Sequence, residues 1–226
     1  MQKKVSVIIP TLNEEETLGA LLDNLSSQEG ISEIIVSDCG STDDTAKIAS
    51  GYNGKVAVVQ SERGRAAQMN TGASFATGDI LWFLHADCKP VDDSVDLING
   101  TLSDDRVVGG GFRWGLDGSK WYYKPFTAMA HVKNKINRNL YGDMGVFVRK
   151  EVFEQLGGFA SISFLEDVEF NRRLRKAGKT VIINKIMYYS DRKLLIKGPI
   201  RTFIKNYIIK FAYILRFSPD FLKKHY

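Results

Sequence analysis

The residues with the clearest chemical potential follow a short apolar run, Leu81-Trp82-Phe83-Leu84. His85 and Asp87 come directly after this run, which is typical of a strand buried on both faces. In an open α/β sheet, ligands bind beyond the carboxyl ends of the strands. A carboxylate there suits an oxygen-ligated divalent cation, and such a cation suits a diphosphate. Asp87 is equally suited to start the turn before Pro90, so both interpretations stay open.

Two other acidic segments also have a chemical and a structural interpretation. Asp38 ends a second apolar run, and Ser41 and Asp44 have the spacing of a capping box for a following helix. The pair Glu166-Asp167 lies at the start of a predicted helix, where Ser163 and Glu166 have the same spacing. Both segments are therefore expected to begin helices, whether or not their carboxylates bind a ligand.

The elements that must position these residues alternate between strand and helix. Strands are predicted at 5–10, 33–38, 55–60 and 80–85, and helices after Pro10, at 41–50 and at 65–76. Thr11 and Asn13 are each placed to cap the first helix. The alternation predicts right-handed βαβ units and a Rossmann-like, mostly parallel sheet. Neither GxGxxG nor GxxxxGKS/T occurs, which argues against dinucleotide and P-loop sites.

The pattern changes after residue 100. Helices are predicted at 91–102, 121–140 and 163–174, and strands at 107–114 and 181–183, with a return to the sheet over 141–149. Glycines at 109–111 indicate close approach of a ligand or of another backbone. From Pro199, apolar residues recur on one face of a predicted helix, at Ile200, Phe203, Ile204, Tyr207, Ile208, Phe211 and Leu215.

Composition limits the class of protein. With 226 residues and 44% hydrophobic content, the chain suits one sizeable α/β domain with appendages. The net charge is +5, and nine Lys and Arg residues at 192–226 stand against one acid, Asp220. This basic amphipathic tail suits an anionic membrane surface, but its apolar stripe equally suits packing on the domain or on a second subunit. Aromatic platforms for nucleic acid are lacking, so no nucleic-acid partner is expected.

The two cysteines, Cys39 and Cys88, fit neither a disulfide framework nor a zinc-ligand spacing. Reduced thiols in a cytoplasmic compartment are therefore expected. Residues 1–4 run directly into a predicted strand, so no signal peptide is expected. No run of eighteen apolar residues predicts a spanning helix.

Taken together, the segments 8–15 and 37–43, the strand leading to Asp87, and Glu166-Asp167 resemble family 2 glycosyltransferases of the GT-A fold. The resemblance covers nearly the whole chain. Segments 64–70, 84–87 and 141–143 and the tail from Arg192 are similar to a smaller branch, the radical-SAM/selenodomain-associated transferase 2 proteins. The resemblance implies a GT-A domain at 1–192, with a nucleotide-binding half at 1–100 and an acceptor-side half at 101–192. The residues at 193–226 would be a C-terminal amphipathic helical tail.

The resemblance also implies a nucleoside-diphosphate sugar as donor, with UDP-sugars ahead of GDP-sugars. Asp38 would accept a hydrogen bond from the imide of the base, as a carboxylate can. Arg65 would border the diphosphate, unless it is a solvated surface arginine, and Asp87 would hold a divalent metal, Mg or Mn. His85 stands where the family's Asp-x-Asp motif has its first acid. The implied donor-side residues are Pro10, Thr11, Asn13, Glu14, Asp38, Ser41, Arg65, Asp87, Asp143 and Arg192.

On the acceptor side, the resemblance implies that Asp167, next to Glu166, is the general base for an unidentified acceptor hydroxyl. One direct displacement inverts the anomeric carbon and needs one base. The basic amphipathic tail suggests a lipid-linked acceptor if it binds a membrane, or a homodimer if it packs on a second subunit. Two alternatives stay open. One is a nucleotidyltransferase, which would have a Gly-rich basic loop after its first strand; residues 10–14 lack such a loop. The other is a non-catalytic nucleotide-sugar-binding protein, which the histidine at position 85 in place of the family's acid keeps open.

Overall fold

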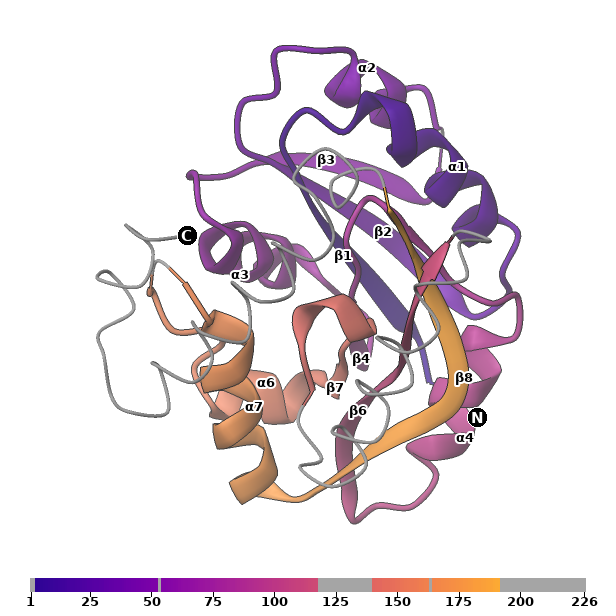
Figure 1. The fold of residues 1–226 in the computed structure, drawn as a ribbon. Coiled ribbons are helices and arrows are strands. Elements are labelled where there is room, and N and C mark those ends of the chain that lie inside the picture. Colours follow the sequence, from indigo (N-terminus) through magenta and orange to yellow (C-terminus); the bar gives the residue numbers. More distant parts are fainter. Residues whose placement is uncertain (1–2, 53, 118–139, 163, 192–226) are drawn as a thin grey trace.

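An eight-stranded sheet runs through the part of the chain that the computed structural model describes, namely residues 3–52, 54–117, 140–162 and 164–191 (Figure 1). The order across the sheet is β3-β2-β1-β4-β7-β6-β8-β5. The strands are β1 Val5–Thr11, β2 Ile31–Asp38, β3 Val56–Gln60, β4 Ile80–Phe83, β5 Cys88–Lys89, β6 Val107–Asp117, β7 Phe147–Arg149 and β8 Lys179–Ser190. The helices are α1 Glu15–Ser26, α2 Thr45–Ser50, α3 Arg65–Phe75, α4 Ser94–Thr101, α6 Lys150–Gln155 and α7 Glu166–Ala177, with a short 3₁₀ turn, η1, at Gly142–Met144.

The first half of the sheet is parallel, as its alternating pattern predicts. β1 lies between β2 and β4, and β3 lies outside β2, with all three pairings parallel. The register places Thr11 beside Asp38, and Asp38 beside Gln60. The carboxyl ends of these strands therefore meet at one edge of the sheet, where an α/β fold binds its ligands.

The second half of the sheet is mixed rather than parallel. β7 runs antiparallel to both β4 and β6, β8 runs parallel to β6, and β5 is antiparallel to β8. Four of the seven strand pairings are parallel, so the expectation of a mostly parallel sheet is confirmed, and the antiparallel pairings all lie in the second half or at its junction with the first. β8 is twelve residues long, where the sequence predicts a strand over 181–183. Its pairing with β6 extends through polar residues, because ladder hydrogen bonds do not require apolar side chains.

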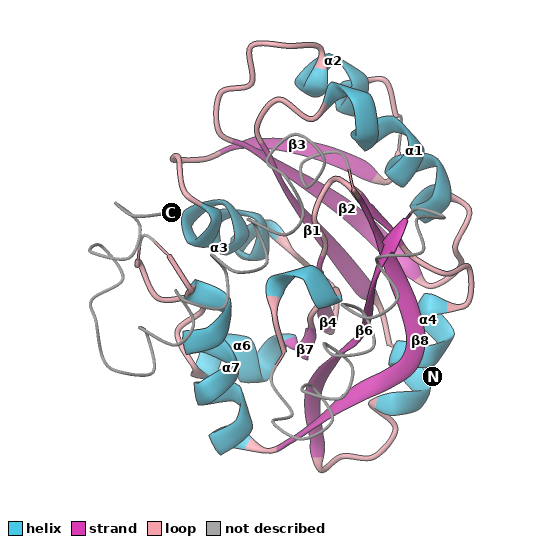
Figure 2. Ribbon diagram, in the orientation of Figure 1, coloured by secondary structure: helices cyan, strands magenta, loops and turns pink. Residues whose placement is uncertain are grey.

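Two layers of helices cover the sheet (Figure 2). One apolar cluster joins α1 and α4 to the sheet, and the other joins α3, α6 and α7 to its opposite face. The apolar residues of α1, the helix predicted after Pro10, are buried in the first cluster, at Leu18, Leu21, Leu22 and Leu25. Ile8 belongs to the second cluster and Ile9 to the first, as alternation along β1 requires. Among the described residues, no helix is long and apolar enough to cross a membrane.

The expected caps of α1 and α2 are wrong. α1 begins at Glu15 and α2 at Thr45, and neither helix has a side-chain cap hydrogen bond at its N-cap residue. α7 begins at Glu166, one of the two residues of its predicted capping box. The other predicted cap residue of α7, Ser163, lies outside the described residues, as do the predicted helix at 121–140, except for its last residue, and the tail at 193–226.

The glycines of β6 allow close approach of neighbouring backbone. This was one of the two expectations for residues 109–111, the other being close approach of a ligand. A Cβ on Gly110 would lie 2.2 Å from the carbonyl oxygen of Val181. A Cβ on Gly111 would lie 3.0 Å from the carbonyl oxygen of Met144, which is a tight contact but not an overlap. The three central strands of the second half therefore pack at a distance that a side chain at 110 would prevent.

We expect Gly110→Ala to lower the free energy of unfolding by about 1–3 kcal/mol, because the added methyl group overlaps the β8 backbone. Urea unfolding would measure the loss. The control is Gly100→Ala on α4, where nothing lies within 4 Å of the new Cβ. That variant should gain about 0.5–1 kcal/mol, because alanine favours a helix more than glycine does. Equal effects of the two substitutions would contradict the packing described here.

Candidate functional site

The Asp38 carboxylate is held by four hydrogen bonds at the end of β2. The hydroxyls of Thr11 and Ser41 donate to Oδ1, and the N–H groups of Gly40 and Ser41 donate to Oδ2 at 2.9 and 2.8 Å. Burial alone would raise the pKa of Asp38, but these hydrogen bonds outweigh it and the pKa is lowered. Asp38 is therefore a fixed negative charge that ties the end of β1 to the loop after β2.

The loops after β1 and β2 form one unit. The N–H of Asn13 donates to Ser41 Oγ at 2.9 Å, and the N–H of Thr42 donates to Asn13 Oδ1 at 2.9 Å. The N–H of Glu14 donates to Thr45 Oγ1 at 2.8 Å. Asn13 has φ of 55°, a left-handed conformation that costs energy and needs such contacts to persist. These side chains bond across the two loops, which explains why they do not cap helices.

Gln68 holds the ends of β1 and β2 by hydrogen bonds, and the sequence did not predict this role. It is buried on α3, and its Nε2 donates to the carbonyl oxygens of Thr11 and Ser37 at 2.8 and 3.1 Å. The sequence pattern that could have identified Gln68 is a polar residue among apolar positions, such as Ala66 and Met69, on the buried face of α3. A buried amide in such a stripe needs hydrogen-bond partners, and the nearest are backbone groups of the sheet.

Asp167 lies at the first turn of α7 and faces the end of β4. Its Oδ2 accepts a hydrogen bond from the N–H of Gly142 at 2.7 Å. A Cβ on Gly142 would lie 3.1 Å from His85 Nε2 and 3.5 Å from Asp167 Oδ2, so the two side chains flank this glycine. Pro10, His85 and Asp167 line one hollow whose walls are otherwise largely apolar. The hollow joins the loop after β1, the end of β4 and the start of α7.

Glu166 is paired with Arg65 across the two halves. Glu166 Oε1 lies 3.3 Å from Arg65 Nη1, and the Glu166 side chain is 5% exposed whereas that of Arg65 is 51% exposed. Burial raises the pKa of Glu166, Arg65 opposes this increase, and the charge of Asp167 adds to it. Leu165, immediately before the pair, has φ of 63°, a strained conformation of the kind found at functional sites. Arg65 therefore links α3 to the start of α7.

Asp87 lies beside a different cavity. This cavity, of about 490 Å³, lies between α1 and the β5 and β8 ends, and Asp87 lines it together with Glu16 and Ser190. The N–H of Ser190 donates to the carbonyl oxygen of Asp87 at 3.0 Å, which fixes the turn after β4. No group of three or more His, Cys, Asp or Glu side chains that could hold a metal occurs among the described residues.

Tyr189 lies between the two regions. Its ring is 6.2 Å from that of His85, centroid to centroid, and nearly perpendicular to it. Burial raises the pKa of Tyr189 well above its ordinary value, and the charges of Cys88, Asp143 and Asp87 add to this. Asp87 and the exposed Asp143 are thus within electrostatic reach of one buried phenol.

The structure brings the predicted site residues together in three groups. The first is the loop unit of Thr11, Asn13, Glu14, Asp38 and Ser41. The second is the hollow with Pro10 and Asp167, next to the pair Arg65–Glu166. Asp87 and Asp143 form the third, because Asp87 follows His85 by two residues and His85 flanks Gly142, the neighbour of Asp143. Arg192 lies outside the described residues.

A mixed α/β sheet with loops gathered at the carboxyl ends of β1, β2 and β4 belongs to a class of fold that binds ligands at this edge. Residues 6–160 match the family model described as glycosyl transferase family 2. The chain therefore belongs to the family 2 glycosyltransferases.

A relative agrees with this assignment, and two solved structures share the fold. Glycosyltransferase AglE of Haloferax volcanii is 33% identical over 190 residues, which are 77% of this chain and 62% of AglE. Mannosyltransferase PcManGT of Pyrobaculum calidifontis, solved in complex with GDP-Man and Mn²⁺, has a TM-score of 0.73 at 21% identity, covering 96% of this chain and 66% of that one. S. aureus TarS 1–349 in complex with UDP-GlcNAc has a TM-score of 0.66 at 17% identity, covering 83% and 58%. The chain thus spans less than two thirds of each of these proteins.

We expect Arg65→Met to destabilise the protein by about 1–2 kcal/mol at pH 8 and by less at pH 5. The substitution leaves the buried charge of Glu166 without its partner. The destabilisation is smaller than that from breaking a fully buried ion pair, because Arg65 is half exposed. The pKa of Glu166 is already raised and would rise further, so its contribution to stability falls as pH rises. Urea unfolding at both pH values measures this difference.

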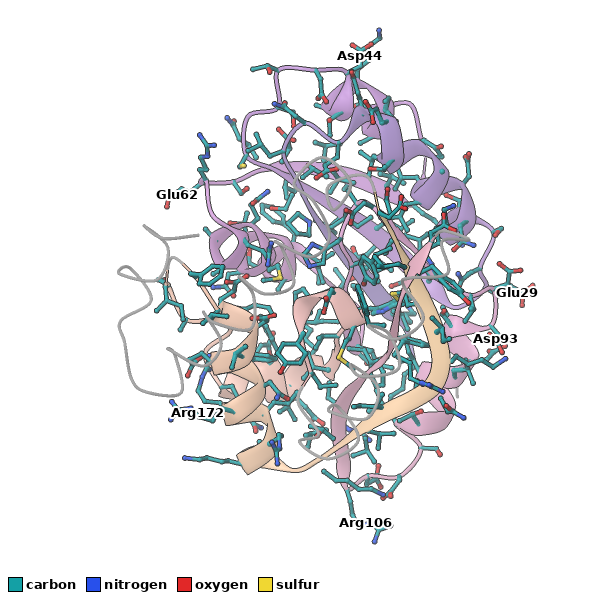
Figure 3. The ribbon with its side chains drawn as sticks, viewed as in Figure 1. Glu29, Asp44, Glu62, Asp93, Arg106 and Arg172 are labelled. Carbon is teal, nitrogen blue, oxygen red and sulfur yellow. The ribbon has the colours of Figure 1, made fainter. Side chains whose placement is uncertain are left out.

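The control for this experiment is Arg106→Met. Arg106 projects from the far end of the molecule (Figure 3), pairs with Asp104 and is 81% exposed. Its hydrogen bonds hold the pKa of Asp104 well below the usual range, so this pair does not titrate between pH 5 and 8. A loss in Arg65→Met that is equal at the two pH values would contradict the raised pKa of Glu166.

Proposed function

We propose that this family 2 glycosyltransferase moves a sugar from a nucleoside diphosphate, with UDP favoured, to an acceptor hydroxyl, with inversion at the anomeric carbon. The observation that carries the proposal is the hollow shared by Pro10, His85 and Asp167. Three segments far apart in the chain converge there, one for the nucleotide, one for the diphosphate and one for the acceptor. A single displacement requires these three parts to lie side by side.

Asp167 is the proposed general base. The N–H groups of Gly142 and Val168 occupy one position on each of its oxygens, at 2.7 and 2.8 Å. An ionised carboxylate has about four acceptor positions, so Asp167 can still accept the proton of an acceptor hydroxyl. The bond to Gly142 fixes the direction of the carboxylate, because η1 positions that amide. Glu166, paired with Arg65, orients the start of α7 in this proposal.

The donor is proposed to lie on the loop unit, with its base near Asp38. The four acceptor positions of Asp38 are already used, so the imide of a uracil would take the place of the Ser41 hydroxyl, which can rotate away. Thr11, Asn13 and Glu14 would face the base and ribose. Arg65 is half exposed and paired with Glu166, and its remaining donors would meet the diphosphate. The UDP-GlcNAc complex of TarS supports UDP, whereas the GDP-Man complex of PcManGT keeps GDP as the second choice.

A divalent metal, Mg or Mn, fits the donor set. Asp87 is a half-buried carboxylate after β4, and Asp143 is a second, exposed one nearby. Metals bound with substrate phosphates commonly use one or two protein carboxylates, so a larger cluster is not required. When bound, the metal would neutralise charge on the departing nucleoside diphosphate. The Mn²⁺ in the PcManGT complex supports this choice of cofactor.

The acceptor and the location are proposed from the sequence of the tail. A basic amphipathic helix at 193–226, following a GT-A domain at 1–192, would bring the site to the cytoplasmic face of a membrane and to a lipid-linked acceptor. Packing of the same stripe on a second subunit is the alternative. In either case Arg192, at the junction, would approach the diphosphate.

We expect UDP or GDP with Mn²⁺ to raise the unfolding temperature of the wild-type protein, and Asp87→Ala to abolish this increase. A ligand at a hundred times its dissociation constant adds about 2.7 kcal/mol to the folded state, which a thermal scan resolves. The matched control is Asp93→Ala, an exposed acid beside α4 (Figure 3), which should keep the increase. An increase that persists in Asp87→Ala would argue against this metal ligand, and no increase in the wild type would argue against a nucleotide donor site.

We expect Asp167→Asn to lower kcat of sugar transfer by about 10²–10⁴, the usual contribution of a general base, with donor affinity unchanged. Transfer from radiolabelled UDP-sugars and GDP-sugars to a membrane lipid extract measures the rate, and calorimetry with the nucleotide measures affinity. Asp93→Asn removes one negative charge elsewhere and should leave both values unchanged. Full transfer by Asp167→Asn would exclude it as the base.

A further inference from the structure

β3 forms one edge of the sheet, and its outer side is open. Among the described residues it pairs with β2 alone, in an unbroken register (Figure 2). Its residues are half-buried or exposed, and Val58 is 38% exposed. Edge strands are commonly protected from pairing with other chains by charges, by proline or by short length. The opposite edge, β5, has two residues and the charged Lys89, whereas Val56–Gln60 has neither a charge nor a proline.

The hydrogen bonds between β3 and β2 decide which backbone groups of β3 point outward. The N–H of Ile34 donates to the carbonyl oxygen of Lys55 at 2.7 Å, and the N–H of Ser61 donates to the carbonyl oxygen of Asp38 at 2.9 Å. The N–H and C=O of one residue in a strand point to the same side, and successive residues alternate. Odd-numbered residues of this segment therefore point toward β2. The outward groups belong to the even-numbered residues, Val56, Val58 and Gln60.

We propose that β3 pairs with β3 of a second copy of this chain, in antiparallel direction, around a two-fold axis at Val58. A two-fold axis perpendicular to the sheet makes two identical edge strands antiparallel. Val58 then lies opposite its own copy, and Val56 lies opposite Gln60 of the second copy. Each outward N–H meets an outward C=O, as in the hydrogen-bonded pairs of an antiparallel ladder. The pairing uses every outward group of the strand, and closed two-fold symmetry is the commonest arrangement of homo-oligomers.

The side chains of β3 suit a copy of the same strand. Directly opposite residues lie on the same face, so the two valines on the axis meet, and Ala57 meets Val59. At the ends, Lys55 precedes the strand and Glu62 follows it (Figure 3), and both are exposed. The antiparallel direction brings Lys55 of each copy to the end where the other copy has Glu62, and Arg63 lies one residue further from the axis. The pairing therefore places opposite charges at its ends and no like charges opposite each other within the strand.

The pairing joins two sheets and leaves both donor edges in place. Gln60 lies beside Asp38, so the carboxyl end of β3 is at the donor edge of its own copy. In the antiparallel pair this end meets the amino end of the other β3. The two donor edges thus lie at opposite ends of the joined sheet, and each copy keeps its own loop unit. The inference is independent of sugar transfer and of any contact through the tail.

Sedimentation of the full chain tests the pairing. The concentrations should span about 1–500 μM, because a short edge pairing lies at the weak end of protein interfaces. We expect a reversible equilibrium in which the mass rises from that of one chain toward that of two. Val58→Lys places two ammonium groups opposite each other on the axis and should raise the dissociation constant about a hundred-fold. The control is Tyr188→Lys, which changes a residue that is 42% exposed on β8 and should leave the dissociation constant unchanged.

Val58→Pro tests the backbone pairing itself. Proline removes an outward N–H that pairing with β2 does not use, so the monomer should keep its circular dichroism spectrum while the dimer is lost. Hydrogen exchange reports the register. The amides of residues 56, 58 and 60 should be protected only at concentrations where the dimer forms, and those of 57 and 59 at every concentration. A wild type that stays monomeric, or a dimer that persists unchanged in Val58→Lys, would overturn the inference, and the second result would favour contact through the tail.

Discussion

The hydrogen bonds that converge on Asp38 hold together the two loops on which the candidate donor site depends. β1 and β2 run in parallel and end side by side at Thr11 and Asp38, so a carboxylate on one strand can hold the end of the other. Gln68 on α3 donates hydrogen bonds to backbone carbonyl oxygens at both strand ends. The loop amides have intramolecular partners, and the loops are therefore ordered before a ligand arrives, which lowers the entropic cost of binding.

The second half of the chain shares the sheet and one apolar cluster with the first half, and polar contacts add to this attachment. Besides the pair Arg65–Glu166, the amide of Asn70 on α3 exchanges two hydrogen bonds with the backbone of Phe159, at 2.8 and 2.9 Å. Arg173 fixes α7 to the same region through the carbonyl oxygens of Leu156 and Gly158. These contacts position the first turn of α7 opposite the end of β4. Asp167 can therefore face the hollow even though it is distant in sequence from the donor-side loops.

Regular elements could be predicted where burial imposes a period on the sequence. The stripe of α1 and the apolar runs of β1, β2 and β4 were assigned correctly in type, because their side chains face a core on one or both sides. Predictions that rested on polar residues were less successful. Asn13 and Ser41 are residue types that often cap helices, yet here they form hydrogen bonds between the loops after β1 and β2. The length of β8 was also missed, because its pairing with β6 does not depend on apolar residues.

The sequence by itself determined the class of fold, the family and the residue types available for the chemistry, because apolar periodicity and short motifs are local properties of the chain. The tertiary structure alone decided which of these residues meet. It paired Arg65 with Glu166, placed His85 and Asp167 on one hollow and Asp87 beside another cavity, and left Oδ1 of Asn171 buried without a hydrogen-bond partner among the described residues. The physical reason is that hydrogen bonds and burial depend on neighbours in space, and those neighbours come from strands and helices far apart along the chain.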